Sequence, residues 1–142
     1  MIYLDTSWLV KRLVAEPDAR AVRAAIDRED ELVASEIAWV EFHSALARRV
    51  REGSLSGRQR SALLQRFQDD WQEVTRVSLT EPVLSRAARL VVSQDLRTLD
   101  AIQLASAMLV AEHSPTPLRF GTADRRLLAA ALAVGFEAPD LA

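Results

Sequence analysis

Short apolar runs alternate with helix-forming segments along the chain, and this alternation restricts the fold more than any other feature of the sequence. The runs predict strands at residues 2–4, 32–34, 74–79 and 118–121. Between them, apolar residues recur at the spacing of three or four that is typical of helices. Strands that alternate with helices favour a parallel sheet covered on both faces. We therefore expect an α/β fold with three α/β/α layers and a central parallel sheet, forming a single domain over residues 1–142.

The expected helices have start and stop signals. Pro17 and Pro82 are tolerated in a first helical turn, and Gly135 is a typical stop. Gly53 to Gly57 is the clearest turn in the chain. The expected helices cover residues 8–14, a segment starting at 16–18, a segment from about 35 to about 53, residues 58–71, a segment opening at 80–82, residues 99–111 and residues 124–134.

The composition removes several kinds of chemistry. The chain has no cysteine, which excludes disulfides, thiolate metal ligands and a cysteine nucleophile. Two histidines, His43 and His113, make a multi-histidine zinc site a poor expectation. No apolar stretch approaches the ~20 residues of a membrane helix, and no export signal follows Met1. We expect a cytoplasmic protein with no membrane contact, in which hard oxygen atoms are the available metal ligands.

Two aspartates stand directly after predicted strands. Asp5 follows the first strand and Asp124 follows the fourth. In open parallel sheets, ligands collect beyond the carboxyl ends of the strands, so both side chains are expected to face that crevice. The hydroxyls of Thr6, Ser7 and Thr122 lie beside them in sequence. Helix capping explains the same two aspartates equally well, because Asp is a preferred cap and each precedes a helical run.

Asp100 is a stronger candidate for function. It is the one charge in an otherwise apolar helix until Glu112, and burying an unpaired carboxylate is costly. The helix dipole is the structural alternative, since Asp100 stands in the first turn. Gln103, three residues later, shares its face and is expected to line the same cleft.

Glu41 is ambiguous from periodicity alone. It lies at the border of the apolar arc of its helix, where a solvated glutamate is ordinary. If all four acids converge, their repulsion, ~4 kcal/mol per pair at ~4 Å, requires protons or metal ions, so a divalent-cation site and a nuclease are the first ideas to test. A local excess of arginine between Arg48 and Arg66 is a solvated face by default and a phosphate-binding clip in a nuclease.

Four segments occur in the order typical of a PIN domain, and together they closely resemble a VapC-type toxin. They are IYLDTS at 2–7, SEIAWVE at 35–41, LDAIQLASA at 99–107 and GTADRRL at 121–127. The resemblance covers essentially the whole chain and implies a cytosolic endoribonuclease that depends on Mg²⁺ or Mn²⁺. It also implies a homodimer neutralised by a VapB-type antitoxin whose tail occupies a groove near the active site.

The same resemblance makes Asp5, Glu41, Asp100 and Asp124 the catalytic and metal-binding acidic quartet, and it is the main reason to include Glu41. Asp5 and Asp100 are the expected primary ligands, because Mg²⁺ takes one or two carboxylates and keeps several waters. Glu41 and Asp124 are then expected to hold waters, to complete a second metal site or to position the attacking water.

Three other functions compete with this interpretation. A phosphate-accepting receiver domain needs a late lysine, whereas Lys11, the only lysine, lies in the first helix. A haloacid-dehalogenase-like phosphatase needs a second Asp two positions after the first, where this chain has Ser7. A PIN-like module that binds RNA or protein without cleavage, with the carboxylates as caps, is the non-enzymatic alternative.

Overall fold

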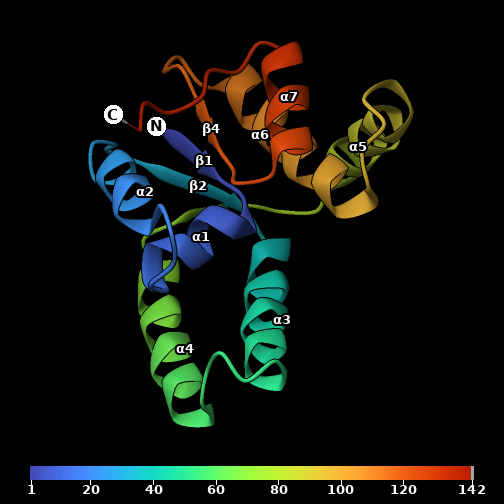
Figure 1. Ribbon diagram of the computed structural model, residues 1–142. Helices are drawn as coiled ribbons and strands as arrows, with labels where there is room; N and C mark the ends of the chain where they lie inside the picture. Colours follow the sequence, from blue (N-terminus) through green and yellow to red (C-terminus); the bar gives the residue numbers. More distant parts are fainter. Residues whose placement is uncertain (142) are drawn as a thin grey trace.

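The computed structural model describes residues 1–141 and confirms the expected three layers (Figure 1). Within these residues, four parallel strands form one sheet in the order β3-β2-β1-β4. The strands are β1 Ile2–Leu4, β2 Leu32–Ser35, β3 Thr75–Val77 and β4 Arg119–Gly121. Tyr3 of β1 lies opposite Val33 on one side and Phe120 on the other, so β1 is paired along both edges.

Helices connect and cover these strands. Their bounds are α1 Thr6–Leu13, α2 Ala19–Ile26, α3 Ile37–Arg51, α4 Gly57–Trp71, α5 Glu81–Ser93, α6 Thr98–His113 and α7 Arg125–Ala133. In this part of the chain, no helix combines the length and the apolar character needed to cross a bilayer.

The two faces of the sheet carry separate cores, because successive strand residues point to opposite sides. Ile2 and Leu4 pack into a cluster with side chains from α1, α2, α3 and α4. Tyr3 packs into a second cluster with side chains from α5, α6 and α7. A strand of three residues therefore serves both hydrophobic layers, and all three of its side chains are fully buried.

The structure corrects some of the expected boundaries. The second helix does not start at 16–18 but at Ala19, since Asp18 adopts a left-handed conformation with φ of 68° and lies in a turn. The first helix starts two residues earlier than expected, at Thr6. The third strand is limited to Thr75–Val77 because it pairs only with the short β2, and the amide of Leu79 instead donates to the Glu36 carboxylate at 2.7 Å.

Helices α3 and α4 form a hairpin that extends away from the sheet (Figure 1). The rings of Phe42 and Phe67 stack across it with centroids 3.9 Å apart. The predicted turn is confirmed: Gly53 has φ of 81°, which favours glycine, and Ser56 forms a capping box with Gln59 at the start of α4. We refer to residues 37–71 as the α3–α4 hairpin.

Candidate active site

The topology brings the ends of β1 and β4 together. After β1 the chain moves to β2 and β3 on one side, and it returns to β4 on the other side of β1. The strand order therefore reverses at the carboxyl end of β1, which is the usual ligand position in open parallel sheets. The amide of Asp5 donates to the carbonyl of Gly121 at 3.1 Å, so the two loops that carry Asp5 and Asp124 are adjacent.

Asp5 is a buried carboxylate with a full set of donors. It accepts hydrogen bonds from the hydroxyls of Ser7 and Thr122, each at 2.6 Å, and from the amide of Trp8 at 3.1 Å. Its side chain is therefore the N-cap of α1. Burial nevertheless raises the pKa of Asp5 to about 6, and the charge of Glu41 adds to that rise. The carboxylate is fixed in place but carries its negative charge at a cost.

Asp124 occupies the equivalent position before α7. Its Oδ1 accepts from the amides of Arg126 and Leu127 at 2.8 and 3.0 Å. Its own amide donates at 3.0 Å to the Thr122 hydroxyl, which in turn donates to Asp5. Capping through Oδ1 leaves Oδ2 of Asp124 without a hydrogen bond among residues 1–141, so capping and exposure to the crevice are compatible there. Both oxygens of Asp5 accept hydrogen bonds, so only a small part of that carboxylate faces the crevice.

Glu41 is tied to the end of β1 by neutral donors. Its Oε1 accepts from the Thr6 hydroxyl at 2.9 Å and from the Gln103 side-chain amide at 2.8 Å. The amide oxygen of Gln103 accepts from the Tyr3 phenol at 2.5 Å. Burial strongly raises the pKa of Tyr3, so its hydroxyl stays protonated and acts as a donor here. The sequence placed Gln103 in the cleft, but it gave no sign of the link to Tyr3, which reads as an ordinary strand residue.

The four predicted acids line a single cavity of about 990 Å³, together with Gln103. Asp100 enters it from the first turn of α6 and is only half-buried. Burial raises the pKa of Asp100, and the charges of Asp124 and Glu41 raise it further. The structure therefore brings Asp5, Glu41, Asp100 and Asp124 to one place, where they repel one another.

The donor chemistry of this cavity fits a hard divalent cation. Carboxylate and hydroxyl oxygens are the ligands that Mg²⁺ and Mn²⁺ prefer. Within residues 1–141, no group of three or more His, Cys, Asp or Glu side chains is already arranged to hold a metal ion. Mg²⁺ takes only one or two protein carboxylates and keeps several waters, so its binding does not require three acids that already converge.

Basic side chains line the same cavity. Lys11, Arg48, Arg49 and Arg97 contribute to its wall. Arg49 and Lys11 both pair with Glu16, whereas Arg48 is exposed and forms no ion pair among residues 1–141. Of the arginines expected to form a clip, Arg48 and Arg49 of α3 line the cavity, whereas Arg51 and the arginines of α4 are not part of its wall. A phosphate group in the cavity would therefore lie near positive charge as well as near the acids.

The aromatic side chain of Trp8, just after Asp5, belongs to the core. It is 3% exposed, and its ring lies directly against Gly121 at the end of β4. A Cβ at Gly121 would lie 2.6 Å from the Trp8 ring, so this position has room only for glycine. Trp8 therefore fixes the distance between α1, which Asp5 caps, and the end of β4, which leads into the loop that carries Asp124.

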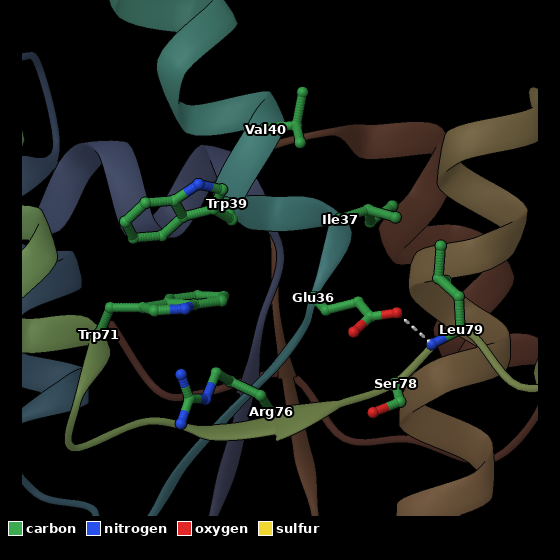
Figure 2. A pocket seen from close by; sticks show the side chains of 8 residues that line it. All are labelled: Glu36, Ile37, Trp39, Val40, Trp71, Arg76, Ser78 and Leu79. Carbon is green, nitrogen blue, oxygen red and sulfur yellow. Dashed lines mark hydrogen bonds between the residues drawn. The ribbon is translucent and has the colours of Figure 1, made fainter.

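A second groove of about 660 Å³ adjoins the acidic cavity, and the two share Ile37 and Val40 (Figure 2). Its wall includes the indoles of Trp39 and Trp71, with centroids 6.0 Å apart. The carboxylate in this groove, that of Glu36, points to the Leu79 amide and accepts its hydrogen bond. Among the described residues, Glu36 is the one acidic residue in the lining of this groove, whereas the neighbouring cavity is lined by all four predicted acids.

A parallel α/β/α domain with acidic side chains at the β1–β4 switch point defines the class of protein. The model of the PIN domain family matches residues 2–133, and the chain belongs to this family. The resemblance seen in the four sequence motifs is thereby confirmed.

Individual proteins of known name and structure are similar to this chain over nearly its whole length. The chain is 32% identical over 135 residues to ribonuclease VapC45 of Mycobacterium tuberculosis, which covers 95% of this chain and 92% of that protein. Among solved structures, FitAcB from Neisseria gonorrhoeae superposes with a TM-score of 0.71 at 20% identity, covering 99% of this chain and 98% of the other. A toxin–antitoxin complex from Klebsiella pneumoniae matches with a TM-score of 0.61 at 20% identity over 91% of each chain. These structures share the fold.

Proposed function

We propose that this protein is an endoribonuclease dependent on Mg²⁺ or Mn²⁺ and the toxin of a VapBC-type toxin–antitoxin pair. The observation that carries the proposal is the convergence of Asp5, Glu41, Asp100 and Asp124 on one cavity at the switch point of a PIN fold. The relative VapC45 is named a ribonuclease and is similar over nearly the whole chain, which supports RNA as the substrate.

The residues of the cavity have different proposed roles. Asp5 and Asp100 are the proposed primary metal ligands, since burial, nearly complete for Asp5 and partial for Asp100, disfavours their charge and a cation would compensate it. Glu41 and Asp124 hold waters, complete a second metal site or position the water that attacks the phosphate. When bound, the divalent ion stabilises charge on the scissile phosphate and on the leaving oxygen. Arg48 holds the RNA backbone next to the acids.

The proposed partners are an antitoxin and a second copy of the chain. The Klebsiella structure is described as a toxin–antitoxin complex, which supports an antitoxin partner. We propose that this partner is a VapB-type antitoxin and that both proteins act in the cytoplasm. Exposed apolar side chains support a homodimer: within the described residues Leu84, Val91 and Val92 of α5 and Leu99 of α6 are exposed, and α5 packs against α6. Exposed apolar side chains on neighbouring helices are typical of interaction surfaces.

One observation favours a different function, that of a PIN-like module that binds RNA or protein without cleavage. Asp5 and Asp124 are both engaged as helix caps, which gives each a structural reason to be present. Capping does not account for Asp100 or Glu41, because neither caps a helix and each adds repulsive charge to the cavity. The nuclease therefore explains more of the site.

The direct test is cleavage of purified total RNA by the protein without antitoxin, with Mg²⁺ or Mn²⁺ supplied and the cut ends mapped by sequencing. We expect internal cuts that appear with either ion and stop when EDTA is added in excess. Restoration of cleavage by fresh metal shows that the chelator did not unfold the protein.

Two results separate the proposals. Cleavage that persists in EDTA excludes the metal mechanism. Tight binding of RNA with no cuts, in ample metal and across diverse RNA substrates, supports the binding module instead.

A further inference from the structure

The Glu41 carboxylate is held through one of its two oxygens. Thr6 and Gln103 both donate to Oε1, at 2.9 and 2.8 Å. Among residues 1–141, no donor contacts Oε2. Because Glu41 lines the acidic cavity, this arrangement leaves Oε2 available to whatever enters it. Both donors are neutral groups, so they hold the carboxylate in place without an ion pair.

The orientation of the Gln103 amide follows from its neighbours. If the amide were turned by 180°, its oxygen would face Glu41 Oε1 at 2.8 Å, and two acceptors would repel. The amide nitrogen therefore faces Glu41, and the amide oxygen faces the Tyr3 phenol. The nitrogen also lies 3.3 Å from the Thr6 hydroxyl, so the amide contacts both Glu41 and Thr6.

Tyr3 provides a rigid base for this amide. It is 0% exposed, lies in the doubly paired strand β1, and stacks on Phe120 with ring centroids 5.2 Å apart. Gln103 is also buried, at 3% exposed. Burying a phenol and an amide is costly unless both are hydrogen-bonded, and Phe and Met would fill the same volume without that requirement. The polar pair Tyr3–Gln103 donates a hydrogen bond to Glu41, which an apolar pair could not do.

We propose that Tyr3 and Gln103 are positioning residues that fix the Glu41 carboxylate, so that its free oxygen is presented to the metal-binding cavity. The inference rests on the proposed function, since it concerns the geometry of the same site. In this role neither residue is a metal ligand, and both act through Glu41. Residues that orient metal-site carboxylates in this way typically change metal affinity or activity by roughly 10–100-fold when substituted.

The experiment uses the full-length protein with Gln103→Met and Tyr3→Phe. Each removes hydrogen-bonding atoms at nearly constant volume and leaves all four acids in place. Mn²⁺ affinity is measured by calorimetry, and RNA cleavage is measured as kcat and KM. We expect Gln103→Met to weaken Mn²⁺ binding and lower kcat by roughly 10–100-fold with KM for RNA unchanged, and Tyr3→Phe to give a smaller change in the same direction.

A double-mutant cycle distinguishes positioning from a general loss of structure. In a Glu41→Gln background, Gln103→Met should leave Mn²⁺ affinity unchanged, because the carboxylate through which it acts is already gone. The matched structural control is Val83→Ala, a truncation in the same core cluster on α5 that contributes nothing to the cavity wall. This variant should lose stability while Mn²⁺ affinity and kcat stay at wild-type values.

The inference is overturned if wild-type protein binds Mn²⁺ and cleaves RNA, and both Tyr3→Phe and Gln103→Met do so equally well. It is also overturned if Gln103→Met weakens Mn²⁺ binding to the same extent in the Glu41→Gln background. Wild-type protein that neither binds Mn²⁺ nor cleaves RNA is a different result, because it removes the proposed function itself and the positioning role with it.

Discussion

At the scale of single residues, Asp5 combines a structural and a chemical task. Its carboxylate caps α1 and accepts the Thr122 hydroxyl, which ties β1 to the loop after β4. The same carboxylate is buried enough that its pKa is raised to about 6. A group whose pKa is raised from 3.8 on folding destabilises the metal-free protein above about pH 6, and this cost disappears as the pH falls through about 4.

We therefore predict that Asp5→Asn stabilises the metal-free protein while it abolishes cleavage. At about pH 7.5 the free energy of unfolding should rise by up to about 3 kcal/mol, because each unit of pKa shift corresponds to about 1.4 kcal/mol. At about pH 4 the gain should vanish. Urea denaturation of wild type and variant in EDTA at the two pH values measures this gain in the free energy of unfolding. If the variant is equally or less stable than wild type at the higher pH, the Asp5 charge is not destabilising and the prediction is wrong.

Asp100 offers the cleanest test of a metal ligand, because no capping role complicates it. Asp100→Asn removes one negative charge at nearly constant volume. We expect kcat to fall by about 100-fold or more, since a ligand to the ion contributes several kcal/mol to catalysis, while the thermal unfolding midpoint of the metal-free protein does not fall, because burial disfavours the charge that is removed.

The matched control for that substitution is Asp95→Asn, which makes the same charge change five residues earlier. Its side chain is 99% exposed, it lies outside the cavity wall, and Asn tolerates the positive φ found there. Cleavage by Asp100→Asn at the rate of the Asp95→Asn control would remove Asp100 from the mechanism.

Residues near strand ends could be predicted from the sequence, and those fixed by packing could not. Asp5 and Asp124 were placed correctly because a carboxylate after a parallel strand faces one edge of the sheet. Glu41 required the family resemblance, because helical periodicity put it on a solvated border. The Tyr3–Gln103 bond joins residues 100 positions apart, and only the packing of α6 against the sheet brings them together.

At the scale of elements, the α3–α4 hairpin places basic side chains next to the acids. Arg48 stands in the last turn of α3 and lines the cavity, whereas the arginines of α4 do not. The sequence showed an arginine-rich segment but could not show which of its members faces the site. That depends on how α3 packs on α1 and the sheet, which is a tertiary property.

We predict that Arg48→Ala weakens RNA binding without slowing chemistry. The KM for RNA should rise several-fold with kcat nearly unchanged. In a plot of the logarithm of the RNA association constant against the logarithm of the salt concentration, the slope should become shallower by about 0.7 for a single-stranded substrate. The control is Arg89→Ala on α5, which removes the same charge from an exposed site outside the cavity wall. An identical salt dependence in the Arg48 and Arg89 variants would show that Arg48 does not contact phosphate.

At the scale of the whole molecule, one topological fact explains the site. In the order β3-β2-β1-β4, the strands that follow β1 are added first on one side of it and then on the other. Acids from distant parts of the sequence therefore meet at the carboxyl end of β1. The alternation of strands and helices predicted the three layers. It could not predict the strand order, which is set by long-range packing and decides which loops become neighbours.

The most direct test of the account is the position of Mn²⁺ in crystals of the protein grown or soaked with that ion, located by its anomalous scattering. The account predicts a peak inside the acidic cavity, within coordination distance of carboxylate oxygens of Asp5 and Asp100, that is lost in Asp100→Asn. Crystals that hold Mn²⁺ at saturating concentration with no peak in this cavity, or with the ion bound only elsewhere, would contradict it.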